Sequence, residues 1–210
     1  MKEFPYQYSC QCLSVASESA IKEVSQFVVT TNYIRHNGAL PNSINEEIQD
    51  VYCEDLHYQS NSWFYVMKND TTQNIVGSIR VIRWDKQCVL PIEKKFGVSV
   101  KKLVEEQLHT VEQVFHIGRF AVSTKEIGFA SIILFKILLT YAFRSVCVAE
   151  NSIVLAELDK KLCATLQLFN IHTTQVGQSK IELGSETIPI CIDAKKLYPF
   201  VEKYKHLCYV

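Results

Sequence analysis

The sequence predicts an α/β (α+β) protein with a mixed, mostly antiparallel sheet, in which a parallel pair of strands flanks a central helix. Two observations predict this class. First, segments 62–70 and 73–85 are rich in β-branched and aromatic residues, and the turn-forming NDTTQN joins them, which is typical of an antiparallel hairpin. Second, strand-like 110–123, helix-like 126–146 and strand-like 152–158 follow in order, and such a long crossover makes its two strands parallel.

Two amphipathic helices are expected before the hairpin. Apolar residues recur at helical spacing over residues 17–35, and Ser17 or Ser19 is the candidate N-cap. A glycine and a proline then break the pattern, and the same spacing resumes in INEEIQDVYCEDLHY, residues 44–58.

The elements after the hairpin follow from the same signals. Residues 90–107 indicate a loop followed by a short helix. The apolar residues of 126–146 would occupy nearly the whole circumference of a helix, which predicts a buried central helix. The remaining expected elements are a helix at 159–169, strands at 172–178 and 187–194, and a closing segment at 194–207 that Pro199 interrupts.

Length and composition limit the function classes. A chain of 210 residues, 48% of them hydrophobic, fits one domain covering residues 1–210. The 22 basic and 22 acidic residues cancel, so general electrostatic binding to nucleic acid or anionic membranes is not expected. The apolar stretch 127–143 contains Lys136 and is too short for a membrane span, and the first residues lack a secretory signal, which predicts a cytoplasmic protein.

The eight cysteines are scattered, and several lie within apolar runs, so we expect reduced thiols. Cys10 and Cys12 form the one close pair, with no second pair or histidine tandem to complete a zinc site. A metal is therefore not expected, and an N-terminal strand is the alternative for this pair.

Residues 125–130 have the pattern of an anion-binding turn. The predicted helix begins directly after a strand, where unpaired amides and the helix dipole favour an anion. Lys125, Gly128 and Ala130 give the spacing Lys-x-x-Gly-x-Ala, a cation followed by small residues that let the backbone approach a phosphate.

This turn resembles that of the GNAT acyltransferases, written (Arg/Gln)-x-x-Gly-x-(Gly/Ala), which binds the pyrophosphate of an acyl-CoA or the arm of an acyl carrier protein. Lys125 replaces the usual Arg or Gln, which keeps the charge but loses the planar fork. The resemblance implies the GNAT fold, no permanently bound cofactor and an acyl-thioester co-substrate, carrier protein or CoA. The residues implied in donor binding are Phe120, Ala121, Val122, Lys125, Gly128 and Ala130.

A narrower branch, the acyl-homoserine-lactone synthases and long-chain N-acyl amino acid synthases, is similar at further motifs. Its fourth strand carries Glu-x-(Ser/Gly)-Arg-Phe-Ala-Val, and residues 116–122 read His-Ile-Gly-Arg-Phe-Ala-Val. Its preceding strand carries Gly-x-x-Arg and two aliphatic residues, as residues 77–82 do, and EDLHY with Asp55 is similar to its upstream acidic motif. The resemblance implies transfer of a fatty acyl group to the amine of an amino acid or similar small molecule.

His116 and Arg119 are the candidate catalytic residues. His116 stands where the branch has a glutamate considered to be a base, a role that imidazole can also perform, although a packed or hydrogen-bonded histidine is the alternative. Three residues apart on a regular strand, the two side chains point to opposite faces. A bulge at Ile117 or Gly118 would bring them to one side and turn a backbone N–H toward the thioester carbonyl.

The resemblance also implies an acceptor pocket around Asp55 and Arg80, with Arg35 as a further member. Arginines in apolar strands require acidic partners, and the resemblance makes Asp55, Glu47 or Asp50 the candidates. The expected ion-pair network either attaches the N-terminal helices to the sheet or shapes this pocket. Lys94, Lys95, Lys101 and Lys102 form the dense basic cluster, either a solvated face or a dock for an acidic carrier protein. An acetyl-CoA-dependent acetyltransferase and a non-catalytic acyl- or CoA-binding module remain the alternatives.

Overall fold

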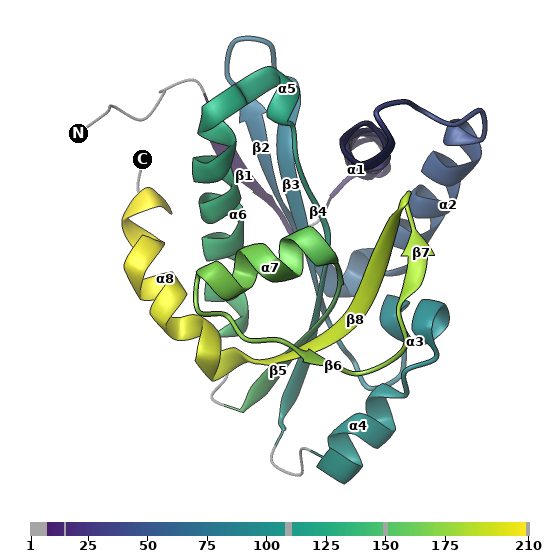
Figure 1. Ribbon diagram of the computed structural model, residues 1–210, viewed down its shortest axis with the longest axis vertical. Helices are drawn as coiled ribbons and strands as arrows, with labels where there is room; N and C mark the ends of the chain where they lie inside the picture. The colour runs from purple at the N-terminus through teal and green to yellow at the C-terminus, as the bar shows by residue number, and fades with distance from the viewer. Residues whose placement is uncertain (1–7, 15, 108–110, 149–150, 209–210) are drawn as a thin grey trace. The chain divides into compact units, whose positions relative to one another are not determined.

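The computed structural model describes residues 8–14, 16–107, 111–148 and 151–208 (Figure 1). The strands form one eight-stranded sheet in the order β1-β2-β3-β4-β5-β8-β6, and β7 pairs with β8 outside this path. The strands are β1 (Tyr8–Leu13), β2 (Ser62–Asn69), β3 (Ile75–Arg83), β4 (Gln113–Val122), β5 (Ser152–Asp159), β6 (Thr174–Gln175), β7 (Lys180–Glu182) and β8 (Ser185–Asp193). The helices are α1 (Glu18–Asn37), α2 (Ile44–His57), α3 (Pro91–Phe96), α4 (Val100–Gln107), α5 (Thr124–Ile127), α6 (Ser131–Val146), α7 (Lys160–Leu168) and α8 (Tyr198–Tyr204).

The predicted fold class is confirmed by the strand directions. β4 and β5 run parallel, with Gln113 opposite Ser152 and Ile117 opposite Ala156, and α6 connects them. The pairs β1–β2, β5–β8, β6–β8 and β7–β8 are antiparallel. The long crossover therefore places a parallel junction in a mostly antiparallel sheet, as the strand–helix–strand order predicts.

The chain divides into two compact units. Unit 1 comprises residues 1–80 and 119–139, and unit 2 comprises residues 81–118 and 140–210. β3, β4 and α6 each contribute residues to both units. The prediction of a single domain over residues 1–210 is not tested by this division and stays a prediction.

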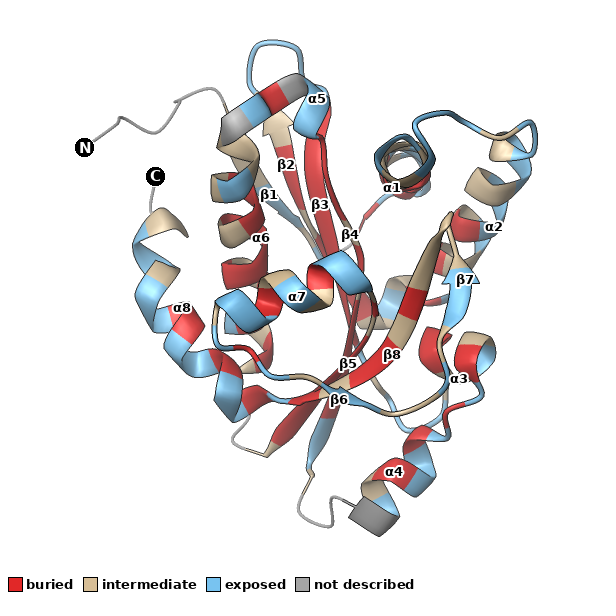
Figure 2. Ribbon diagram, in the orientation of Figure 1, coloured by how far each residue is buried: buried red, intermediate tan, exposed pale blue. Residues whose placement is uncertain are grey.

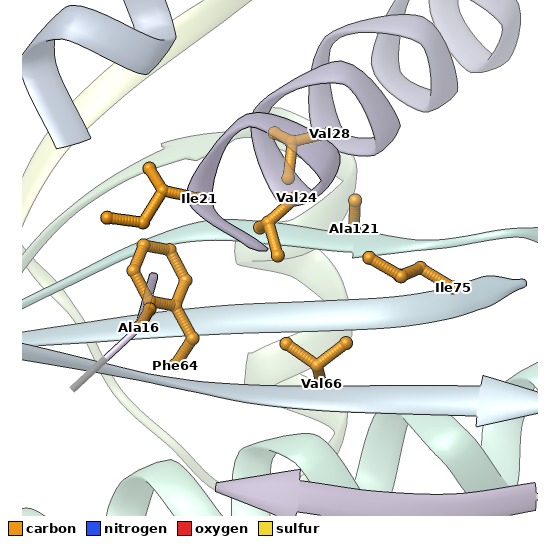
Figure 3. Close-up of a cluster of buried hydrophobic side chains, with 8 residues drawn as sticks. All are labelled: Ala16, Ile21, Val24, Val28, Phe64, Val66, Ile75 and Ala121. Carbon is orange, nitrogen blue, oxygen red and sulfur yellow. The ribbon is translucent and has the colours of Figure 1, made fainter. Parts of the chain in front are cut away.

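Unit 1 has a helix layer on each face of its strands. On one face, Ile21, Val24 and Val28 of α1 pack toward a group of strand side chains (Figure 3), namely Phe64, Val66, Ile75 and Ala121. On the other face, the Phe120 ring meets Phe135 of α6 edge-on at 5.1 Å between centroids. Phe120 and Ala121 of β4 therefore pack against helices on opposite faces, because successive side chains of a strand point to opposite sides.

Gly77 explains how closely α6 approaches β3 in unit 1. A Cβ at this position would lie 2.8 Å from Cδ1 of the buried Leu138 and 3.6 Å from the Ala121 carbonyl oxygen. A larger residue would push the helix side chain away, since packed interiors have little free volume.

Unit 2 is built around β5 and β8, with α6 and α8 joined by aromatic contacts. The ring centroid of Phe200 in α8 lies 5.5 Å from that of Phe143 in α6. It also lies 5.5 Å from the ring centroid of Phe169, which follows α7. The Tyr141 hydroxyl donates to the Cys208 carbonyl at 3.0 Å. The strand and the helix of this unit differ in burial: nearly all residues of β5 are buried, whereas α7 carries several exposed residues (Figure 2).

Three local predictions differ from the structure. A helix, α3, forms where a loop was expected, because Pro91 starts it and the Glu93 carboxylate accepts the Leu90 N–H at 2.8 Å. The central helix begins at Ser131 rather than at 126, since Gly128 is left-handed with φ 50° and separates α5 from α6. The three-residue strand β7 was not expected, and its length gives the sequence too little periodicity to show it.

Two predictions about the N-terminal residues are confirmed, the cap of α1 and the strand that contains Cys10 and Cys12. Ser17 caps α1, its hydroxyl accepting the Ala20 N–H at 3.2 Å. Cys10 and Cys12 lie in β1, paired with β2, and all eight cysteines are free thiols. Within the described ranges, no helix is long and apolar enough to cross a membrane, and no group of three or more histidine, cysteine or acidic side chains is placed to hold a metal ion.

Candidate functional site

His116 and Glu157 form a partly buried pair in unit 2. His116 lies on β4 opposite Leu155 of the parallel strand β5, and Glu157 follows two residues later on the same face of β5. The His116 Nε2 atom lies 2.9 Å from Oε1 and 3.0 Å from Oε2 of Glu157. The pairing is therefore set by the register of two adjacent strands rather than by a loop.

The two ring nitrogens of His116 differ in their hydrogen-bond partners. His116 has no exposed surface, whereas the Glu157 side chain keeps 14% of its own. Nδ1 of His116 is buried and has no hydrogen-bond partner among the described residues. Nε2 is thus committed to a carboxylate, while Nδ1 remains available for a further hydrogen bond.

An ion-pair network of two arginines and two carboxylates lies in unit 1. Asp55 Oδ1 accepts from Arg119 Nε at 2.8 Å and from Arg80 Nη1, and its Oδ2 accepts from the Ser25 hydroxyl at 3.3 Å. Glu54 Oε1 lies 2.7 Å from Arg119 Nη2 and 3.5 Å from Arg80 Nη2. The network joins α2 to β3 and β4, which agrees with the predicted role of attaching an N-terminal helix to the sheet.

Burial shows why these charges must be paired. Asp55 has 0%, Arg80 1% and Arg119 9% of its surface exposed. A buried charge without a partner costs several kcal/mol, so each guanidinium needs its carboxylate. The Tyr58 ring lies 5.6 Å from the Arg80 guanidinium carbon, and Arg80 Nε has no partner among the described residues.

The backbone of β4 is irregular at Arg119. Its φ is 54°, in the left-handed region that non-glycine residues rarely enter, and the Ser78 hydroxyl donates to its carbonyl at 2.8 Å. The irregularity therefore falls one residue beyond Gly118, where a bulge was predicted. Such a conformation costs on the order of 1 kcal/mol and persists where its surroundings hold it, as the ion pairs of Arg119 do here.

The predicted donor-binding residues lie along the end of β4 and the turn that follows. Ala121 and Val122 are buried, and Phe120 and Ala130 are partly exposed. Lys125 and Gly128 are exposed, and no atom lies within 4 Å of a Cβ built on Gly128. The backbone there is open to a ligand, but it belongs to the four-residue α5 and a 3-10 turn rather than to the start of a long helix.

Arg35 is the one predicted pocket residue that the structure does not bring into the network. It lies exposed in the last turn of α1, and no hydrogen bond or ion pair joins it to another described residue. Of the four lysines, Lys95 lies 3.7 Å from Glu182 and Lys101 3.9 Å from Glu105, while Lys94 and Lys102 are exposed. Part of the basic cluster is therefore neutralised locally.

Unit 2 also holds a pocket of about 420 Å³ beside Trp84. Lys101 is the one predicted site residue that lines it. The lining residues are Arg83, Trp84, Asp85, Lys86, Lys101, Val104, Glu105, Val111, Glu112, Gln113 and Val114.

Two acidic residues of these clusters were missed by the sequence reasoning. Glu54 is adjacent to Asp55, and its helical position alone does not distinguish it from the nearby candidates Glu47 and Asp50. Glu157 did leave a signal, because it is the one charged residue within the apolar run SIVLAEL. A lone carboxylate in a buried strand requires a partner, and the parallel register supplies His116.

Comparison with known proteins identifies the fold. No family model matches the sequence, and no curated protein does. Among solved structures, FeeM, an N-acyl amino acid synthase from uncultured soil microbes, matches at 16% identity and TM-score 0.55, over 95% of this chain and 98% of FeeM.

Two further structures support the same assignment. BjaI, a CoA-dependent acyl-homoserine lactone synthase, matches at 12% identity and TM-score 0.53, over 95% of this chain and 89% of its own. A putative acetyltransferase of the GNAT family from Desulfovibrio desulfuricans matches at 12% identity and TM-score 0.50, over 89% of this chain and 99% of its own. The chain thus has the GNAT fold.

Proposed function

We propose, from this shared fold, that the protein is an N-acyltransferase that moves an acyl group from a thioester to the amine of a small molecule. The observation that carries the proposal is the position of the motif His116–Val122, which occupies β4 beside its parallel partner β5 in a fold shared with two synthases of this chemistry. The motif is read from the sequence and the fold from the structure, and both support the same chemistry.

The acyl acceptor in this proposal is an amino acid or a related small amine, and the donor is a fatty acyl thioester of CoA or of an acyl carrier protein. FeeM, an N-acyl amino acid synthase of the same fold, supports the amino acid as acceptor. BjaI, a CoA-dependent synthase of the same fold, supports a CoA thioester as donor. Phe120, Ala121, Val122, Lys125, Gly128 and Ala130 bind the donor, without a permanently bound cofactor. A cytoplasmic location stays a prediction.

Two residue groups have assigned roles in the reaction. His116 is the base. Arg119 is the second candidate catalytic residue, and the carboxylates of α2 hold it in a backbone conformation that regular strands do not adopt. Asp55 and Arg80 shape the acceptor pocket through the same network, and Arg35 is proposed as a pocket residue that lies outside this network.

A donor panel tests the proposal. Purified protein is given acetyl-CoA, long-chain acyl-CoA or long-chain acyl carrier protein, each with a panel of amino acids and small amines. Thiol release and N-acyl products are followed by mass spectrometry, and we expect an N-acyl product from a long-chain donor. Turnover of acetyl-CoA alone would instead identify an acetyltransferase, and thioester binding without any product would identify a non-catalytic module.

The same assay separates the two donors. Lys102 is exposed on α4, so Lys102→Glu should lower kcat/KM for an acyl carrier protein about tenfold at low salt through weaker electrostatic steering, while leaving acyl-CoA unaffected. Lys203→Glu, on the exposed side of α8, is the matched charge reversal. Equal effects of both variants on both donors would exclude the lysine cluster as the dock.

A further inference from the structure

We propose that Glu157 and His116 act as a carboxylate–imidazole pair, in which Glu157 fixes the proton on Nε2 and Nδ1 is the atom that accepts the proton of the attacking amine. The inference rests on the proposed acyltransfer. It adds a residue, Glu157, and it assigns the proton-accepting role to one of the two ring nitrogens.

The tautomer follows from the donor and acceptor inventory. An ionised carboxylate only accepts hydrogen bonds, and both Glu157 oxygens lie within 3.0 Å of Nε2. Nε2 must therefore carry the hydrogen, which the two oxygens share. A neutral imidazole has one proton, so the lone pair is on Nδ1.

Nδ1 of His116 lacks the hydrogen-bond partner that a buried nitrogen normally has. His116 is wholly buried, yet Nδ1 has no hydrogen-bond partner among the described residues, and buried polar atoms without partners are rare. A packed histidine with a purely structural role would be expected to use both nitrogens. An amine N–H of the acceptor substrate supplies the missing donor, and it places the reacting nitrogen within reach of a base.

The step balances with this pair alone. The amine nitrogen attacks the thioester carbonyl carbon, a C–N bond forms, and the amine proton passes to Nδ1. The imidazolium keeps its Nε2–H toward Glu157, whose negative charge stabilises the positive ring. The tetrahedral intermediate then expels the thiolate as the C–S bond breaks, and the thiolate takes the proton from Nδ1. Amide and free thiol are released, and the pair returns to its starting state without a covalent intermediate.

Glu157 is a positioning residue in this scheme, and His116 is the catalytic one. The arrangement depends on the parallel register that places Leu155 opposite His116, because a shift of one residue on β5 would turn Glu157 to the other face. Serine-hydrolase triads also use a carboxylate to orient an imidazole and stabilise its charged form, although there the carboxylate contacts Nδ1 and Nε2 is the base.

The first measurement is independent of activity. Nitrogen-15 NMR of the intact protein, with the His116 signals assigned by their loss in His116→Gln, reports which ring nitrogen is protonated. We expect hydrogen on Nε2 and none on Nδ1. A hydrogen on Nδ1 in the parent protein would overturn the inference whatever the enzyme's activity.

The second measurement is kinetic, with the donor and acceptor identified by the panel above. Glu157→Gln and His116→Gln should each lower kcat about 10²–10⁴-fold with KM changed less than about threefold, as expected for loss of a general base or its orienting partner. Glu186→Gln is the matched control, since Glu186 lies on β8 and pairs with Lys160. All three variants should melt within a few degrees of the parent.

The outcomes separate the two proposals. If the parent forms product and both His116→Gln and Glu157→Gln retain its kcat, the pair is not the base and the acyltransferase assignment survives. If His116→Gln is inactive while Glu157→Gln keeps the parental kcat, the role of Glu157 is overturned. If the parent forms no product with any donor and amine, the proposed function fails, and the catalytic role of the pair fails with it.

Discussion

Asp55 is the fully buried carboxylate of the ion-pair network in unit 1. Its two oxygens accept from Arg80, Arg119 and Ser25, and its side chain has no exposed surface. Glu54 shares both arginines but keeps 17% of its side-chain surface in contact with solvent. The two adjacent carboxylates should therefore differ in their contribution to stability.

Asp55→Asn should lower the free energy of unfolding by about 3 kcal/mol or more, because it leaves two buried guanidinium groups with one shared carboxylate. Urea denaturation followed by circular dichroism gives the change. Glu23→Gln is the control, since the Glu23–Lys68 pair is exposed and should contribute less than about 1 kcal/mol. Equal losses for the two variants would contradict a network that depends on burial.

At the scale of elements, the two N-terminal helices begin differently although serine precedes both. Ser17 has extended backbone angles and its hydroxyl accepts the Ala20 N–H, whereas Ser43 has φ −79° and ψ 6° and makes no such capping bond. The Ser43 hydroxyl donates instead to Glu47 at 3.1 Å. A capping residue stabilises a helix only when its side chain reaches the unpaired amides of the first turn.

Ser17→Ala should therefore cost about 1 kcal/mol of stability, and Ser43→Ala only a few tenths of that, because only the first removes a partner of a helix amide. The pair is matched in chemistry and in position relative to its helix. Thermal unfolding of both variants beside the parent measures the difference. A larger loss for Ser43→Ala would show that the Ser43–Glu47 bond matters more than the cap.

At the scale of the whole molecule, partly buried thiols make the free energy of unfolding depend on pH in the alkaline range. Burial raises the pKa of Cys147, Cys191 and Cys208 from 9.0 to about 11, and burial together with Asp85 does the same for the pKa of Cys88. Each folded thiol holds its proton more tightly than the unfolded one. Their contribution is fully present below pH 9 and is lost as the pH rises toward 11.

The urea midpoint should therefore fall between pH 9 and pH 11, and Cys191→Ala should flatten this fall because it removes one of the thiols whose pKa is raised. Cys53→Ser is the control, since Cys53 is exposed on α2. Midpoints measured at intervals of half a pH unit give the slope for each protein. A slope that Cys191→Ala leaves unchanged would mean that the buried thiol does not contribute to it.

The sequence by itself determined the fold class and most elements. Period-2 and period-3.6 patterns are local, so β2, β3, β5, α1 and α2 could be recognised without tertiary information, and the long crossover made β4 and β5 parallel. The motif of β4 likewise indicated the branch whose fold the structure shares. Ser17 was recognised as a cap because capping depends on neighbouring residues only.

Tertiary structure alone decided the partners. That His116 faces Glu157 depends on a strand register spanning 41 residues of chain, and that Asp55 and Glu54 share Arg80 and Arg119 depends on how α2 packs on the strands. The left-handed backbone at Arg119 is likewise stable only because those contacts hold it. Spacing along the chain reports which face of its own element a side chain occupies, but the identity of the facing group comes from packing, which brings together residues far apart in sequence.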